Sequence, residues 1–256
     1  MGVKFTKLLL VLMVLIFCGC TNYHNKYYRD LTNGIDFRKN PNIEISNAPP
    51  KLITTNNHDE TARKLREDGY SAVGYSSFWT SRDFSEPEAI EYAEQIKASV
   101  ILFSKKYRNS QSESTPLILP NTQTSYNSFI GTTTTYGTQT TYIPTTSHYY
   151  DYMISYWIKQ KSFRLGIEVK DLSDADKIAL GSNKGAVVDI VTKNTTAYEA
   201  DIINGDLIRK ISDDAVLDKD SFYKLLDKHE GNTVKITLIR NGQEISKDVR
   251  INKTVK

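Results

Sequence analysis

The sequence has only two cysteines, Cys18 and Cys20, and both lie within its first 20 residues. No cysteine beyond them is available for a disulfide, so the rest of the chain must be stabilised by its hydrophobic core alone. A length of 256 residues is enough for two small domains.

The chain also lacks a strong net charge and a long apolar run. Residues 8–17 are almost entirely apolar, but a membrane-spanning helix needs about 20 such residues. The formal charge is +3, and it becomes about +1 once Lys4 and Lys7 are left out. No basic patch remains, so nucleic acid is not an expected partner.

Residues typical of catalysis or metal binding are scarce. The four histidines are His24, His58, His148 and His229. No paired His or Cys spacing indicates a metal site, and Gly131 and Gly137 lack the Gly-Lys-Ser/Thr ending of a phosphate loop. We therefore expect no cofactor. A Ser-His-Asp site needs a base oriented by a third group, and spacing alone leaves open a site built from His148, Asp151 and a loop serine.

The first 19 residues have the pattern of an export signal. Lys4 and Lys7 precede the apolar run, which ends at small Gly19. Phe17-Cys18-Gly19-Cys20 resembles a bacterial lipobox, although Phe stands where that pattern usually has Leu. The resemblance implies cleavage before Cys20 and lipidation of its sulfur and new amino group, a stable membrane anchor. An ordinary cleaved signal and a retained membrane helix stay open as alternatives.

The residue after Cys20 bears on location. Thr21 replaces the Asp that retains lipoproteins in the inner membrane of well-studied Gram-negative bacteria. By that analogy we expect a lipid-anchored protein of the bacterial cell envelope, in the outer membrane and facing the periplasm.

Residues 20–44 are polar and without periodicity, which predicts a lipid-proximal tether. A small α/β domain is predicted for residues 45–160. Its expected elements are strands at 51–54, 71–78 and 98–104, with helices at 58–68 and after Ser85. Ser85 and Glu88 have the spacing of a capping box, and Pro87 suits an early helical position.

A segment within this domain, about 109–147, is rich in Thr and Tyr and almost free of charge. It predicts a long loop or a β-hairpin. The alternative is a dedicated assembly surface, since uncharged segments of this kind can add to a sheet edge. Residues 148–158 alternate clearly and predict a strand.

Residues 161–256 carry an ordered set of motifs. They are Leu165-Gly166-Ile167, a strand at 185–191, a turn at 194–200, Gly205-Asp206, a helix at 220–230 and a hairpin around Asn241-Gly242. This order resembles the PDZ domain attached to bacterial HtrA-type proteases, although Asp201 replaces a usual Gly. The fold class expected is α+β, with the PDZ domain as a partly open β-barrel or sandwich carrying two helices.

The resemblance implies a groove for extended peptides or protein C-termini. The turn at Gly166 would hold the terminal carboxylate through backbone amides, assisted by Arg164. The groove residues it implies are Leu165, Gly166, Ile167 and Val169 from the turn and strand, and Phe222, Leu225 and Leu226 from the helix. One of Leu225 and Leu226 is expected to face the groove and the other the core.

The trypsin-like domain that precedes PDZ in HtrA-type proteases has a Gly-x-Ser-Gly-Gly loop, and this string is absent. The sequence therefore favours a non-enzymatic envelope lipoprotein that binds peptides for assembly, scaffolding or protein quality control. Two alternatives stay open. One is an assembly protein that binds through its Thr/Tyr-rich surface while PDZ is structural. The other is an unrecognised hydrolase that uses PDZ for specificity.

Overall fold

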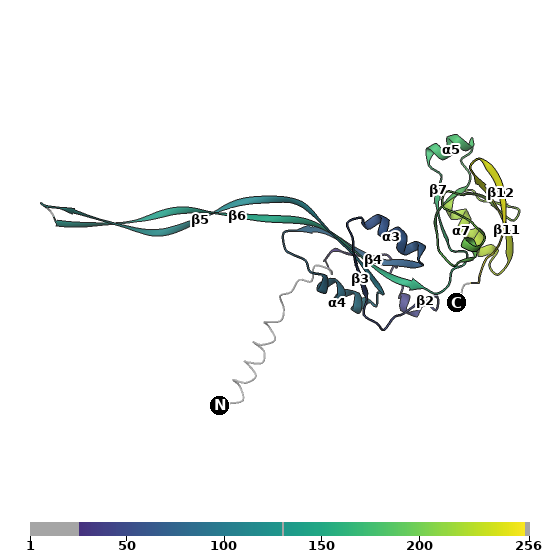
Figure 1. Cartoon of the computed structure of the whole chain (residues 1–256), viewed down its shortest axis with the longest axis horizontal. Helices are drawn as coiled ribbons and strands as arrows, with labels where there is room; N and C mark the ends of the chain where they lie inside the picture. Colours follow the sequence, from purple (N-terminus) through teal and green to yellow (C-terminus); the bar gives the residue numbers. More distant parts are fainter. Residues whose placement is uncertain (1–25, 130, 254–256) are drawn as a thin grey trace, which may run out of the picture. The chain divides into compact units, whose positions relative to one another are not determined.

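The computed structural model describes residues 26–129 and 131–253 (Figure 1). The predicted signal at residues 1–19, the predicted lipidation site Cys20 and His24 lie outside the described residues. Among the helices that are described, none has the length and apolar character needed to cross a membrane.

The first sheet follows the order β1-β4-β6-β5-β3, and β2 pairs with β6. Its strands are β1 (Tyr28–Asp30), β2 (Ile43–Glu44), β3 (Lys51–Thr54), β4 (Tyr70–Thr80), β5 (Val100–Asn127) and β6 (Gly131–Gln160). The pair β3–β5 is parallel, as expected when helices separate consecutive strands. The strand predicted at 51–54 is confirmed, and the one predicted at 98–104 begins two residues later and continues much further.

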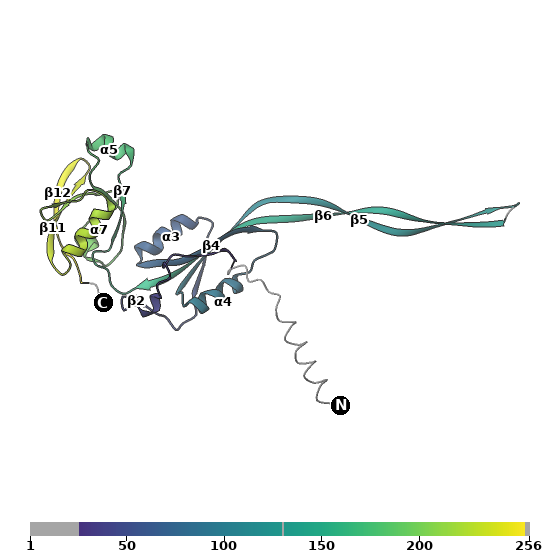
Figure 2. The ribbon, with the colours of Figure 1, turned by 180° about the vertical axis from the view of Figure 1, so that it is seen from behind.

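Two helices cover opposite faces of this sheet (Figures 1 and 2). On one face, Leu65 of α3 (His58–Glu67) packs with Val100, Leu102 and Trp157. On the other, Tyr92 of α4 (Glu86–Ile96) contacts Tyr156, with ring centroids 5.3 Å apart. Neighbouring residues of one strand point to opposite faces, so each strand supplies both cores. The predicted capping box at Ser85 is present.

Part of the segment predicted as a tether is built into the sheet, so that prediction is wrong for these residues. β1 pairs antiparallel with β4, a single turn of 3-10 helix follows at η2 (Phe37–Lys39), and β2 pairs with β6. The Tyr28 ring lies over Gly74, where an added Cβ would come within 2.1 Å of the Tyr28 hydroxyl oxygen. The sequence did not predict β1 because a polar strand of three residues is too short to show a periodicity. Its pairing also depends on Gly74, which is distant in the sequence.

Residues 105–127 of β5 and 131–152 of β6 run side by side as a two-stranded ribbon (Figure 2). The whole strands are 28 and 30 residues long, and residues 105–152 form a compact unit with residues 78–84. The Thr/Tyr-rich segment is thus a hairpin rather than a loop, and the strand predicted at 148–158 is the last part of β6.

The second sheet has the order β12-β11-β9-β8-β7, and β10 pairs with β9. Its strands are β7 (Ile167–Asp171), β8 (Ala186–Val191), β9 (Leu207–Ile211), β10 (Asp214–Ala215), β11 (Thr233–Arg240) and β12 (Gln243–Arg250). Three helices accompany it, α5 (Asp174–Leu180), α6 (Thr196–Glu199) and α7 (Lys219–Lys228). The core joins residues of strands and helices, among them Val188, Ile208, Phe222 and Ile236, all fully buried. Helix α5 was not anticipated from the sequence, and the remaining elements follow the expected order.

We expect Gly74→Ala to detach β1, because the new methyl group would occupy the space of the Tyr28 ring. That ring also packs on Tyr92, at 5.1 Å between centroids, so the cost is that of an overpacked core, roughly 1–3 kcal/mol. Chemical denaturation gives the stability, and limited proteolysis tests whether residues 28–44 become accessible. Gly137→Ala is the matched control, since its added Cβ meets no atom closer than 3.8 Å. Equal stability of the two variants would contradict this packing.

Candidate functional site

β7 is the edge strand of the second sheet. Its only strand partner in the described fold is β8, so its other edge is free of strand pairing. Helix α7 packs beside β7 (Figure 1), and its start is fixed by a capping box in which Asp218 accepts a hydrogen bond from the Ser221 amide at 2.7 Å. The edge and the helix together border a hollow that begins at the turn before β7.

The backbone of that turn, residues 163–166, is held by its carbonyl groups. Asn252 donates to two of them, from Nδ2 to Phe163 O at 3.0 Å and from its amide to Arg164 O at 2.8 Å. The Ala197 amide donates to Leu165 O at 3.1 Å, and the Thr192 amide to Gly166 O at 2.8 Å. Four consecutive carbonyls therefore point into the body of the domain.

Gly166 permits this arrangement for two reasons. Its φ is +87°, a left-handed conformation that side chains disfavour. It also lies against Thr195, because a Cβ at Gly166 would be 2.2 Å from Thr195 Oγ1. Thr195 is itself buried and donates through Oγ1 to Thr192 O at 2.7 Å. The turn thus rests on a side chain that leaves no room for a methyl group.

The amides of the turn have no such partners. Within the described residues, the N–H groups of Leu165 and Gly166 donate no hydrogen bond to the protein. Ile167 opposes Val191 one residue beyond the bond from Thr192 to Gly166, which makes Ile167–Val191 a non-hydrogen-bonded pair whose backbone groups point away from β8. Three successive amides are consequently available to an acceptor, and such clusters bind anions.

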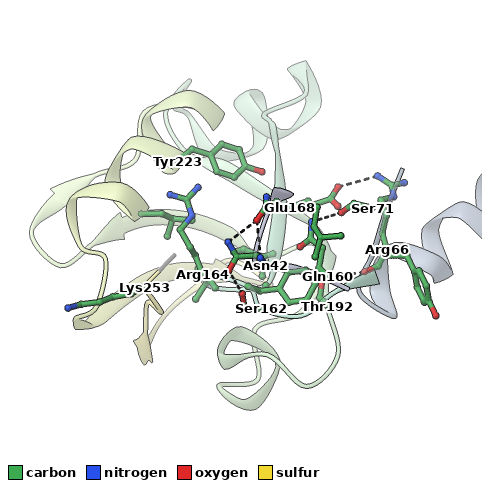
Figure 3. Close-up of a pocket in the computed structure, with 18 residues that line it drawn as sticks. Asn42, Arg66, Ser71, Gln160, Ser162, Arg164, Glu168, Thr192, Tyr223 and Lys253 are labelled. Carbon is green, nitrogen blue, oxygen red and sulfur yellow. Dashed lines mark hydrogen bonds and ion pairs between the residues drawn. The ribbon is translucent and has the colours of Figure 1, made fainter. Parts of the chain in front are cut away.

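A cavity of about 360 Å³ lies beside these amides (Figure 3). Leu165, Gly166, Ile167 and Leu226 line it from the turn, β7 and α7. Polar residues complete it, among them Asn42, Arg66, Gln160, Ser162, Thr192 and Lys253. Ser162 Oγ donates to Asn42 Oδ1 at 2.7 Å.

The charged groups of the cavity are mainly cationic. Arg66, Arg164 and Lys253 line it together with one carboxylate, that of Glu168. Arg66 Nη1 lies 3.3 Å from Glu168 Oε2, and Arg164 is paired with Asp227 of α7. Lys253 has no ion-pair partner among the described residues. An anionic group at the amide cluster would therefore meet a favourable field.

Tyr223 stands at the open edge of β7 and was missed by sequence reasoning. It lies on α7, is half-buried and lines the cavity. The pKa of its hydroxyl is raised above the usual value, mainly by burial, and the adjacent backbone amide of Val169 offsets part of this effect. The hydroxyl is thus a neutral hydrogen-bonding group placed beside the strand edge. An amphipathic tyrosine adjacent to the apolar face of a helix was the available signal.

The predicted groove residues separate into two groups. Leu165, Gly166, Ile167 and Leu226 line the cavity, and Leu226 is the helical leucine that faces it. Val169, Phe222 and Leu225 are not among the lining residues. Phe222 is fully buried in the core, and Leu225 packs partly buried against the same cluster. The helical periodicity marks the core face of α7, and the groove lies at its border.

The three histidines that the structure describes, His58, His148 and His229, are not arranged as a catalytic triad. His148 Nδ1 lies 2.7 Å from Ser110 Oγ, but Asp151 pairs with Arg108 at 2.8 Å instead of orienting the imidazole. His58 Nε2 lies 2.9 Å from buried Ser155, and the other ring nitrogen is buried without a hydrogen-bond partner among the described residues. His229 contacts Asp214 at 2.9 Å. The residues that are described contain no group of three potential metal ligands.

Part of the chain is similar to a known protein family. Residues 164–251 match the PDZ domain family. A serine protease Do-like HtrA of Lactobacillus helveticus is 33% identical over 76 residues, which are 29% of this chain and 18% of that protease. The chain thus spans less than a fifth of the length of this curated relative.

Solved structures give more distant similarities. The HtrA3 PDZ domain bound to a phage-derived ligand is 15% identical, with 34% of this chain and 81% of that chain covered and a TM-score of 0.30. The HtrA-type protease AlgW with a decapeptide is 22% identical, and the similarity covers 38% of this chain and 36% of the AlgW chain, with a TM-score of 0.30. Residues 164–251 form a PDZ domain, and no protease domain is evident in the residues that the structure describes.

We expect Gly166→Ala to destabilise the PDZ domain more than Gly205→Ala. Both glycines have a similar backbone conformation, with φ of +87° and +89°, but an added Cβ meets no atom within 4 Å at Gly205. The control therefore carries only the cost of the left-handed backbone, about 1–2 kcal/mol, while Gly166→Ala adds the overlap with Thr195. Denaturant unfolding of both variants measures the difference. If it is zero, the close approach does not constrain the turn.

Proposed function

We propose that the PDZ domain binds extended peptide segments, and C-termini in particular, by adding them as a strand to the edge of β7. The observation that carries the proposal is the turn at 163–166. Its carbonyls all bond to the domain, while the amides of residues 165–167 have no protein partner within the part of the chain that the structure describes. Three amides beside an unpaired strand edge suit a terminal carboxylate followed by an extended backbone.

Different parts of the cavity would bind different groups of the ligand. The carboxylate would accept from the amides of residues 165–167, with the charge of Lys253 nearby. The last side chain of the ligand would contact Leu165, Ile167 and Leu226, which favours an apolar residue. Tyr223 would contact the ligand a little further along the strand, where its hydroxyl already lies beside the Val169 amide.

The role of the whole chain is proposed on wider grounds. A binding domain is recognised at 164–251. Within the described residues, neither His148 nor His58, each of which lies beside a serine, has its ring oriented by a carboxylate. We propose a non-enzymatic lipoprotein of the bacterial envelope, anchored through Cys20 and facing the periplasm from the outer membrane. Its PDZ domain would bind extended peptide segments or C-termini of partner proteins in assembly, scaffolding or protein quality control.

Binding should require a free carboxylate. The full chain is titrated with peptides that end in apolar residues, each as the free acid and as the amide, and affinity is measured by fluorescence anisotropy. We expect the acids to bind and the amides to lose most of the affinity. Lys253→Glu should weaken the binding of the acids by roughly fivefold to tenfold, because it reverses the charge beside the carboxylate.

Lys184→Glu is the matched control, because Lys184 is exposed and does not line the cavity. Terminus capture fails if acids and amides bind equally, or if the two charge reversals have the same effect. Absence of binding by any peptide to a folded chain would reject the groove itself.

The anchor is tested separately from the groove. Expression of the full chain in a bacterium that processes lipoproteins should yield a membrane-bound form whose mass exceeds that of residues 20–256 by the mass of a diacylglyceryl group and an N-linked acyl chain. We expect Cys20→Ser to abolish this increase, because the thioether has no sulfur to form on. Cys18→Ser serves as the control. An unchanged mass in the Cys20→Ser variant would exclude lipidation at this site.

A further inference from the structure

The ribbon formed by residues 105–127 and 131–152 has no covering layer within its own unit. Nearly all of its side chains are exposed from residue 106 to residue 147, including large apolar ones such as Ile118, at 64%, and Tyr136, at 82%. Each strand spans roughly 75 Å at the usual rise per residue. An isolated two-stranded hairpin is only marginally stable in water, and a third strand is the usual remedy.

Charge is missing from this ribbon in a way that limits the partner. A quarter of the residues in the whole chain are charged, yet none of the residues from 114 to 147 is Asp, Glu, Lys or Arg. Natural edge strands normally carry charges, lysine above all, to prevent pairing with other chains. The ribbon lacks that protection along its outer two-thirds.

Side-chain contacts define the register of the two strands. Ser112 Oγ lies 3.1 Å from Thr146 Oγ1, and Thr124 Oγ1 lies 3.4 Å from Thr134 Oγ1. The Gly137 position faces Asn121, whose carbonyl oxygen is the nearest atom to an added Cβ. These pairs belong to one antiparallel register, in which even-numbered residues oppose even-numbered residues.

The prolines then show which backbone groups point outward. Pro116, Pro120 and Pro144 all have even numbers. A proline has no N–H, so it occupies strand positions whose amide would face away from the neighbouring strand. The even-numbered residues therefore direct their backbone groups to the outer edges of the ribbon.

The two outer edges differ as a result. On β5, Pro116 and Pro120 remove two of the outward donors between residues 114 and 122. On β6, six consecutive outward positions retain their N–H groups. They are Thr132, Thr134, Tyr136, Thr138, Thr140 and Tyr142. The edge of β6 from 132 to 142 is thus the one open to another strand.

We infer that this β6 edge pairs antiparallel with the same edge of a second copy of this chain, giving a four-stranded ribbon. In a two-fold interface residue i of one copy contacts residue j of the other and j contacts i, so charges of one sign along the edge would repel across it. The absence of charge removes that repulsion.

A two-fold axis at Gly137 would place Thr134 opposite Thr140 and Tyr136 opposite Thr138, all with outward amides. Such β-branched and aromatic pairs stabilise cross-strand contacts. The interface is independent of the proposed peptide groove.

The test is sedimentation velocity of the full chain in a non-ionic detergent, with protein concentration varied. We expect a concentration-dependent dimer. The double variant Thr134→Pro/Thr138→Pro removes two outward donors without touching the bonds inside the ribbon, since Thr138 already lies opposite Pro120. Each copy loses two donors, so the loss of four hydrogen bonds per dimer should raise the dimer dissociation constant at least roughly tenfold.

Thr122→Pro is the matched control, because it makes the same change on the outer edge of β5. It should leave the dissociation constant unchanged, and denaturant unfolding checks that both variants remain folded. Hydrogen exchange provides a second measurement, in which even-numbered amides from 132 to 142 gain protection with concentration and Ile118 does not. A monomer at all concentrations overturns the proposal, as does equal weakening by Thr122→Pro or association that the double variant leaves intact.

Discussion

The close approach of Gly166 to Thr195 is the constraint on which the binding site depends. Because no side chain fits between them, the turn before β7 can settle deeply enough for four carbonyls to reach Asn252, Ala197 and Thr192. Once the carbonyls are committed to the interior, the amides of the same peptide units must face outward. Because the carbonyls are bonded inside the domain, the outward amides form a hydrogen-bond donor site without any functional side chain. The cations nearby adjust its field, but the direction of the amides comes from the backbone.

Polar side chains lie next to the strand edge beside this turn. Tyr223 places its hydroxyl next to the Val169 amide, and Glu168 is paired with Arg66 at 3.3 Å. Both contacts are polar, so polar groups next to the edge of β7 already have partners without a ligand. A short strand with polar neighbours also limits unspecific pairing.

Several features of this arrangement could be predicted from the sequence. Local signals of turn and cap chemistry act within a few residues, so Ser85 with Glu88, Gly205-Asp206 and Asn241-Gly242 each predicted a boundary that the structure contains. Contacts between residues far apart in the sequence could not be predicted from such local signals. The pairing of β1 depends on the space above Gly74. Whether Tyr223 faces the cavity depends on the rotation of α7 about its own axis when its apolar side packs on the core. Periodicity identified that side correctly as apolar, but Phe222 is in the core and the neighbouring Tyr223 faces the cavity.

The exposed edges of β7 and β6 therefore differ in length, charge and termination. The edge of β7 is short, flanked by charges and closed at one end by amides whose arrangement would suit a terminal carboxylate. The edge of β6 is long, uncharged and without such an end, so backbone bonding along it cannot distinguish one uncharged strand from another. Discrimination on that edge has to come from side-chain pairs, and a strand rich in Thr and Tyr matches best with another of the same composition. Peptide recognition and self-association thus make different demands on a strand edge, and this chain has one edge suited to each.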